Sequence, residues 1–122
     1  MSFPSPARDY AEKGIDLNKV LIQHPHATFF MYAESDAMVD AHMPQGSLLV
    51  IDRAVDAKNG DIVIAVVNGE FIVRYLRKNE YTCWLYPANR KLREMKITPE
   101  MNMEVWGVVI HIVVNPKSAA HV

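Results

Sequence analysis

The stretch DIVIAVVNGEFIVRYLR at residues 61–77 decides the fold class of this chain. Residues 61–67 are a nearly continuous β-branched run, which is typical of a strand that is buried on both faces or lies at a subunit contact. Asn68-Gly69 follows at once, and a second apolar run begins at Glu70. Asn-Gly between two such runs is the strongest short-range signal for a β-hairpin. These residues therefore predict two adjacent antiparallel strands.

Other short strands are expected on both sides of this hairpin. Apolar or aromatic runs that can form them lie at residues 28–33, 47–53, 81–86 and 103–114. Asp16 can cap one short helix, and Pro25 stops that helix from extending beyond His24. Five or six short strands with one or two short helices predict a mainly β domain, either a sandwich or a partly open barrel.

Composition limits the kinds of protein that this chain can be. Its 122 residues are 50% hydrophobic and 22% charged, with a net charge of −1, which fits one domain and leaves no room for a cofactor module. A near-neutral chain does not coat nucleic acid through bulk charge. Cys83 is the single cysteine, which excludes an intrachain disulfide and favours a reducing compartment. The longest apolar run, residues 105–114, is too short to span a membrane, so we expect a cytoplasmic protein.

Two segments stand out along the chain. Residues 1–14, with Pro4 and Pro6, are expected to form a flexible N-terminal arm, and residues 15–122 the folded domain. Residues 74–96 carry seven basic and two acidic side chains. This run is either a solvated hairpin edge whose charges block edge pairing or a docking surface for an acidic protein or for DNA. We favour the solvated edge, because glutamates interrupt the run and aromatic residues do not interleave it in a repeating way.

Spacing alone reveals no complete catalytic or metal-binding set. His24-Pro25-His26 could form part of a metal site, but no cysteine or nearby carboxylate completes it, so a surface turn is the better interpretation. The chain has no Ser-His-Asp order, phosphate loop or dinucleotide fingerprint. We therefore expect no metal and no cofactor.

Six stretches of the chain resemble, in order, the C-terminal domain of the LexA/UmuD family. These are the self-cleaving Ser-Lys (S24) peptidases of the bacterial DNA-damage response. The stretches are FPSPARDY (3–10), IDLNKVLIQHPHAT (15–28), GSLLVIDRAV (46–55), GDIVIAVVNGEFIVRYL (60–76), LYPAN (85–89) and EVWGVVIHIV (104–113). The similarity is closest to the UmuD branch, and it implies a curved, mostly antiparallel β fold that forms a homodimer.

The residues at the family's catalytic positions differ from the family pattern. The nucleophilic serine of the family sits in a Ser/Gly-Asp-Ser-Met stretch, and this chain has Ala37 there, in Glu34–Met38. The general-base lysine corresponds to Arg74. A methyl group cannot attack a carbonyl, and an arginine cannot act as a base near neutral pH. Ser35 is expected to point elsewhere. The resemblance therefore predicts that the chain is not an enzyme, with Ala37 and Arg74 as vestigial positions.

The start of the chain resembles the processed form of the family, UmuD-prime. Residues 2–6, Ser-Phe-Pro-Ser-Pro, match the stretch that follows the cleavage site, as in phage-encoded, pre-trimmed members. This implies a non-catalytic accessory subunit that dimerises and binds a UmuC-type Y-family polymerase, contacts DNA only indirectly and supports SOS translesion synthesis and mutagenesis. The resemblance places Ile64, Phe71 and Trp106 at the dimer interface, where large apolar residues are typical. They could instead be ordinary core residues.

Three alternatives stay open. The chain could be a Ser-Lys autopeptidase of this family whose active site was altered by engineering at Ala37 and Arg74. It could be a fragment of a LexA-type repressor without its DNA-binding domain. It could also form mixed dimers with a host UmuD or UmuD-prime.

Overall fold

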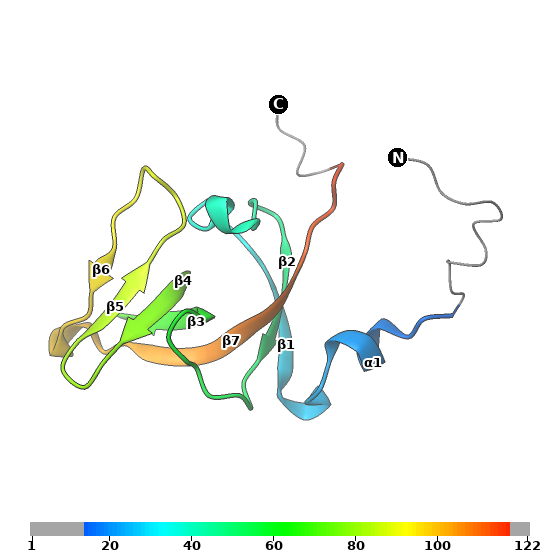
Figure 1. The fold of residues 1–122 in the computed structure, drawn as a ribbon, viewed down its shortest axis with the longest axis horizontal. Helices are drawn as coiled ribbons and strands as arrows, with labels where there is room; N and C mark the ends of the chain where they lie inside the picture. Colours follow the sequence, from blue (N-terminus) through cyan, green and yellow to red (C-terminus); the bar gives the residue numbers. More distant parts are fainter. Residues whose placement is uncertain (1–13, 118–122) are drawn as a thin grey trace.

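The chain folds around one antiparallel sheet in which β7 joins two halves. The computed structural model describes residues 14–117. Its strands are β1 (Thr28–Tyr32), β2 (Leu48–Asp52), β3 (Ile62–Val67), β4 (Glu70–Lys78), β5 (Cys83–Tyr86), β6 (Met95–Lys96) and β7 (Glu104–Val113). Their order in the sheet is β1-β2-β7-β3-β4-β5-β6 (Figure 1). Because β1 and β6 are unpaired edges within these residues, the sheet is a curled, open structure, which confirms the predicted mainly β fold.

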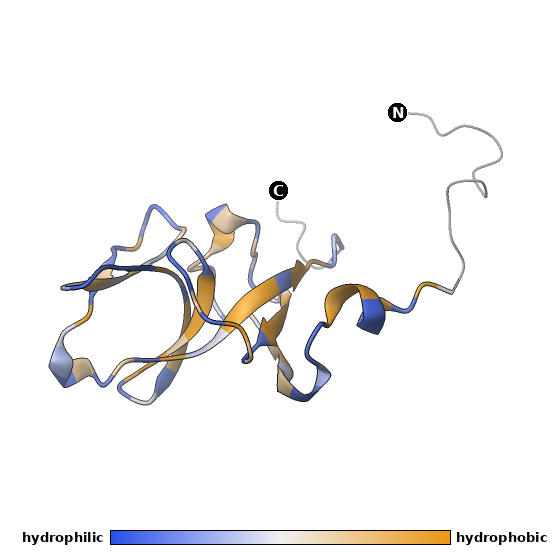
Figure 2. Cartoon of the chain, turned by 60° about the horizontal axis from the view of Figure 1, so that its bottom comes forward, coloured by the Kyte–Doolittle hydropathy of each residue, from blue (hydrophilic) through white to orange (hydrophobic). Residues whose placement is uncertain are grey.

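Short helical segments connect the strands. They are α1 (Leu17–Leu21) and three 3-10 turns, Pro25–Ala27, Val39–Ala41 and Pro99–Met101. The carboxylate of Asp16 accepts a hydrogen bond from the Asn18 amide at 3.0 Å, so the predicted cap of α1 is confirmed. α1 buries none of its residues, and it lies beside the sheet rather than on it (Figure 2). No helix in residues 14–117 is long and apolar enough to cross a membrane.

The predicted hairpin joins β3 to β4. Asn68 and Gly69 both have positive φ, 51° and 84°, the conformation that a two-residue hairpin turn requires. The pairing places Val67 opposite Glu70 and Ile62 opposite Tyr75. This register fixes which side chains of β4 share a face with the core residues of β3.

β3 is buried on both faces, as its run of β-branched residues predicted. One core contains Met38, Met43, Leu49, Ile51 and Ile64. The other contains Val63, Ala65, Val67, Leu76, Leu85 and Val108. Successive side chains of a strand point to opposite faces, so β3 contributes to both cores and holds the two halves of the sheet together.

The sheet bends where β7 pairs with β2 and β3. Both pairings shift register, between Val50 and Ile51 and between Ile64 and Ala65, and such irregularities bend the strands that carry them. Gly107 lies at the centre of this bend, where an added Cβ would stand 2.6 Å from Cγ2 of Ile51. The bend therefore needs a residue without a side chain at position 107.

The predicted arm and domain boundaries are only partly covered by the structure. Residues 1–13 and 118–122 lie outside the described residues, so the division into an arm at 1–14 and a domain at 15–122 stays a prediction. Within the described part, the last turn before α1 contains Gly14, with φ of 72°.

Candidate functional site

A cleft opens beside the first half of β4. β4 pairs with β3 from Glu70 to Tyr75, but β5 joins its other edge only from Tyr75 onwards. The cleft next to this free edge has a volume of about 1010 Å³, and β1 and the loop after it form its other wall. Its lining includes Phe30, Tyr32, Ser35, Ile64, Phe71 and Arg74. A free strand edge in an open cleft is the geometry in which an extended peptide binds as an added strand.

Ala37 sits in the turn between β1 and β2, and its side chain is buried, 3% exposed. Its carbonyl accepts a hydrogen bond from the Ala88 amide at 2.9 Å, and the Ala88 carbonyl accepts one from the Asp40 amide at 2.8 Å. The side-chain amide of Asn89 also donates to the Asp36 carbonyl at 2.9 Å. These three bonds tie the turn to the segment after β5. They fix the backbone both before and after Ala37 in the sequence.

Ser35 and Arg74 line the same cleft, which the sequence did not predict. Ser35 and Ala37 have different surroundings, because Ser35 lines the cleft whereas Ala37 is buried. Ser35 Oγ accepts a hydrogen bond from the Ala37 amide at 3.2 Å. Arg74 is half-buried, and Nη1 donates to the Val73 carbonyl at 2.8 Å. Burial lowers the pKa of Arg74, yet a guanidinium keeps its charge near neutral pH.

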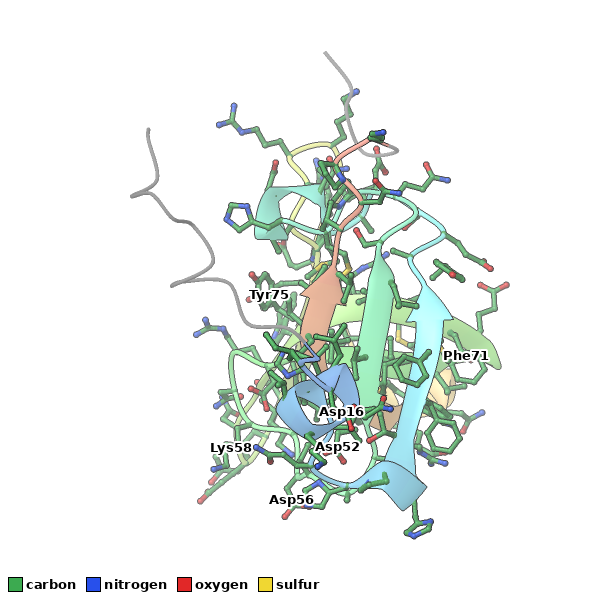
Figure 3. The ribbon with its side chains drawn as sticks, turned by 90° about the vertical axis from the view of Figure 1, so that its right-hand side faces the viewer. Asp16, Asp52, Asp56, Lys58, Phe71 and Tyr75 are labelled. Carbon is green, nitrogen blue, oxygen red and sulfur yellow. The ribbon has the colours of Figure 1, made fainter. Side chains whose placement is uncertain are left out.

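Three aromatic rings next to the cleft contact one another and are called here the aromatic cluster: Phe29 and Phe71, which are exposed, and Trp106, which is partly buried against the core. Trp106 is edge-on to both phenylalanines, with ring centroids 5.2 Å from Phe29 and 5.7 Å from Phe71. The Arg53 guanidinium lies 4.3 Å from the Trp106 ring centroid, and its Nε donates to the Trp106 carbonyl at 2.7 Å. Phe71 is 53% exposed, beside β1 in Figure 3. The cluster thus presents two exposed rings on a third ring that packs against the core.

Ile64 belongs to the protein interior. It is 0% exposed and packs in the core with Leu49 and Ile51. Of the three positions that the resemblance assigned to a dimer interface, Phe71 and Trp106 lie in the aromatic cluster. Ile64 also borders the cleft, and the assignment of all three residues to a dimer interface stays a prediction.

His24 has a role that the sequence did not reveal. Its Nδ1 lies 2.6 Å from Oδ2 of Asp52, a buried carboxylate at the end of β2. Asp52 also accepts a hydrogen bond from the Ala54 amide at 2.7 Å. The two partners are 28 residues apart, so no local pattern in the sequence could predict this contact, which ties the segment after α1 to the sheet.

Other reactive side chains do not gather into a site. Within residues 14–117, no three His, Cys, Asp or Glu side chains come together as a metal would require. Burial raises the pKa of the Cys83 thiol, although the nearby charge of Lys78 opposes this shift. A thiol with a raised pKa is a poor nucleophile at neutral pH.

Comparison with known proteins identifies the fold family. The peptidase S24-like family matches residues 1–110. The chain belongs to the peptidase S24-like family. It is 43% identical to protein ImpA of Escherichia coli over 91% of this chain and 75% of that protein. It is 39% identical to protein SamA of Salmonella typhimurium over 95% of this chain and 80% of the relative. It is 36% identical to protein MucA of Escherichia coli over 89% of this chain and 75% of that protein. Within the family, the chain is UmuD-like.

Membership of this family corrects one prediction. The residues at positions 37 and 74 led to the expectation that the chain is not an enzyme, but the family that matches residues 1–110 is a peptidase family. The prediction rested on two side chains and ignored the rest of the cleft. The structure has a cleft with a strand edge on one wall and with Ser35 and Arg74 in its lining.

Proposed function

We propose that this chain is an accessory subunit for mutagenic DNA synthesis. In this proposal it forms a homodimer and binds a UmuC-type Y-family polymerase subunit, and the complex copies damaged DNA during the SOS response. The support is its place among UmuD-like proteins, with 43% identity to ImpA over 75% of that protein. Its contribution is a set of surfaces that a polymerase subunit and a second copy recognise.

The aromatic cluster is the observation that carries the dimer part of this proposal. Exposed aromatic residues are enriched at protein interfaces and supply much of their binding energy. Phe29 and Phe71 are 42% and 53% exposed, although each contacts Trp106. The cation of Arg53 over Trp106 limits how that ring can turn, so the surface is organised in advance. Preorganised surfaces lose less entropy when they associate.

Co-purification tests the polymerase part. The chain is co-expressed with a UmuC-type polymerase subunit that carries an affinity tag, and the eluted complex is separated by size. The proposal predicts that the two proteins elute together with two copies of this chain for each polymerase subunit. A Phe71→Ala, Trp106→Ala variant should co-elute much less. Tyr81→Ala, which removes another exposed aromatic residue outside the cluster, should behave like the unchanged chain. Separate elution of two folded proteins would contradict the proposal.

A further inference from the structure

One face of the β4–β5–β6 half combines aromatic rings and cations. We call it the basic-aromatic face; its residues are Tyr75, Arg77, Trp84, Tyr86 and Lys96. In the pairing of these strands, Tyr75 lies opposite Tyr86, Arg77 opposite Trp84, and Trp84 opposite Lys96. Residues directly opposite in antiparallel strands share a face. The pairing therefore places rings and cations of three strands side by side on one face.

The rings and cations of this face are within reach of one another. The ring centroids of Trp84 and Tyr86 are 6.2 Å apart, and their planes are tilted by only 30°. The Arg77 guanidinium is 5.8 Å from the Tyr86 centroid, and Lys96 Nζ is 6.0 Å from that of Trp84. Each ring of this near-parallel pair thus has a cation beside it.

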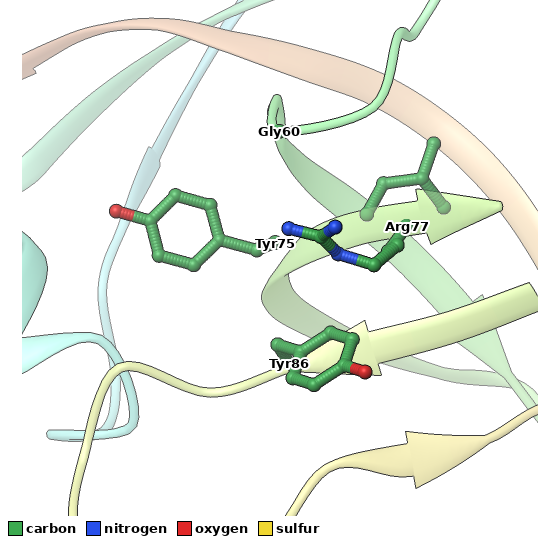
Figure 4. A pocket seen from close by; sticks show the side chains of 5 residues that line it. Gly60, Tyr75, Arg77 and Tyr86 are labelled. Carbon is green, nitrogen blue, oxygen red and sulfur yellow. The ribbon is translucent and has the colours of Figure 1, made fainter.

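Two clefts make this face concave. One, of about 470 Å³, is lined by Gly60, Tyr75, Leu76, Arg77 and Tyr86; Figure 4 shows the side chains of Tyr75, Arg77 and Tyr86 around it. The second, of about 320 Å³, includes Lys78, Trp84 and again Arg77 and Tyr86 in its lining. Because Arg77 and Tyr86 border both clefts, the two clefts are adjacent on this face.

The charges of the face are available to a ligand. Residues 74–96 carry seven basic and two acidic side chains. Arg77, Lys78 and Lys96 are exposed, and none forms an ion pair with a carboxylate of residues 14–117. A solvated edge that only prevents strand pairing would need cations and no rings between them.

We propose that the basic-aromatic face binds single-stranded nucleic acid. Bases would stack on Trp84 and Tyr86, and phosphates would pair with Arg77 and Lys96. Proteins that bind single strands without sequence preference combine a basic groove with aromatic stacking platforms, and some present their rings from the face of a sheet. An acidic protein would use the cations and gain little from two near-parallel rings. A duplex would keep its base faces stacked and hidden from them.

This inference goes beyond the proposed function, and its test does not need a polymerase. The purified chain is titrated into fluorescently labelled dT20, rU20 and a 20-base-pair duplex, and anisotropy is recorded at several salt concentrations. The proposal predicts binding of single strands in preference to the duplex, with affinity that falls as salt increases. The ratio of dT20 to rU20 affinity then distinguishes DNA from RNA as the ligand.

Matched variants assign the binding to this face. Tyr86→Ala should lower the affinity for dT20 about tenfold or more, because it removes one stacking platform. Arg77→Ala with Lys96→Ala should reduce the slope of log affinity against log salt by about 1.4, or about 0.7 for each phosphate that the protein no longer neutralises. Tyr81→Ala and Lys19→Ala remove an exposed ring and an exposed cation elsewhere and should bind as the unchanged chain does. Circular dichroism checks that each variant is folded.

The fluorescence of Trp84 is a second readout that does not depend on a change in stability. In a Trp106→Phe background, Trp84 is the only tryptophan, and dT20 should quench its emission. Three results would overturn the proposal: no binding of dT20 at 50 mM salt, duplex binding as tight as single-strand binding, or unchanged affinity in the folded Tyr86→Ala and Arg77→Ala, Lys96→Ala variants. If the cation variants instead abolish co-purification with a polymerase subunit and leave dT20 binding intact, the face is a docking site for an acidic protein.

Discussion

Nδ1 of His24 lies 2.6 Å from a carboxylate oxygen of Asp52, whose side chain is 1% exposed. Burial alone would raise the pKa of this carboxyl, but the hydrogen bonds from His24 and from the Ala54 amide outweigh burial and lower it below 3.8. A buried carboxylate that accepts two hydrogen bonds can stay charged in the folded protein. If it loses one of the donors, the fold loses stability, because a buried charged group is left partly unsatisfied. The contact therefore makes the segment before β1 part of the folded unit.

His24→Ala should lower the free energy of unfolding at pH 7 by about 1 kcal/mol, because it removes a hydrogen bond to a charged group that is half-open to water on the histidine side. The substitution should also change how the free energy of unfolding depends on pH in the acid range. The folded-state pKa of Asp52 is lowered, so its contribution to stability is complete above the unfolded value near 3.8 and is lost as the pH falls below it.

Urea denaturation between pH 5 and pH 3 measures this effect. The stability of His24→Ala should fall less steeply with decreasing pH than that of the unchanged chain, because the pKa of Asp52 is then closer to its unfolded value. His26→Ala, two residues further on, is the control. Equal slopes in the unchanged chain and in His24→Ala would show that the contact contributes nothing in solution.

Gly107→Ala tests the tight contact at the bend of β7. Its Cβ would stand 2.6 Å from Cγ2 of Ile51 and 3.2 Å from Cγ of Arg53. Ile51 is completely buried, so the core must shift, and overpacking of this kind costs about 1–3 kcal/mol. In a double-mutant cycle with Ile51→Ala, the two losses should sum to more than the loss in the double variant. Strict additivity would mean that the predicted clash does not occur.

Gly69→Ala tests a different cost at the hairpin between β3 and β4. Gly69 has φ of 84°, and an added Cβ would meet no atom within 4 Å. The penalty is therefore one of backbone conformation, about 1–2 kcal/mol for a residue with a side chain in the left-handed region. Unlike Gly107→Ala, it should be additive with Ile51→Ala. Chemical denaturation measures the free energy of unfolding of the single and double variants. A free energy of unfolding that Gly69→Ala leaves unchanged would contradict the hairpin geometry.

Phe71→Ala with Trp106→Ala should convert the proposed dimer to monomers. Truncation of central aromatic residues costs an interface about 2 kcal/mol or more each, so sedimentation velocity at micromolar concentration should show a sharply increased monomer fraction. Leu92→Ala, at another exposed apolar residue, should leave the distribution unchanged. A dimer that persists in the double variant would move the interface away from the aromatic cluster.

Local patterns in the sequence predicted the strands and the helix cap. The register of strand pairing decided which side chains from different strands became neighbours, and local patterns do not encode it. Asn68-Gly69 predicted the hairpin, and the cap of α1 was visible at Asp16 because both depend on a few consecutive residues. The basic-aromatic face was missed for the opposite reason. Arg77 and Trp84 appear seven residues apart and without a repeating pattern, and they become neighbours only because the β4–β5 pairing places them opposite each other.

The candidate cleft shows the same limit. Matching of residues to a family pattern identified positions 37 and 74, but it could not say which side chains of the turn are buried. The Ala37 carbonyl accepts a hydrogen bond from the Ala88 amide and the Ala37 side chain is buried, whereas Ser35 and Arg74 line the cleft. The pairing of His24 with Asp52 is likewise a tertiary contact that no local periodicity encodes.

Restoration of mutagenesis in living cells tests the central proposal most directly. The chain is expressed in bacteria that lack their own UmuD but retain a UmuC-type polymerase, and damage-induced mutation frequency is measured after ultraviolet irradiation. The account predicts that the unchanged chain restores mutagenesis and that the Phe71→Ala, Trp106→Ala variant does so far less at an equal protein level. A stable, abundant chain that leaves the mutation frequency at that of cells without it would contradict the account.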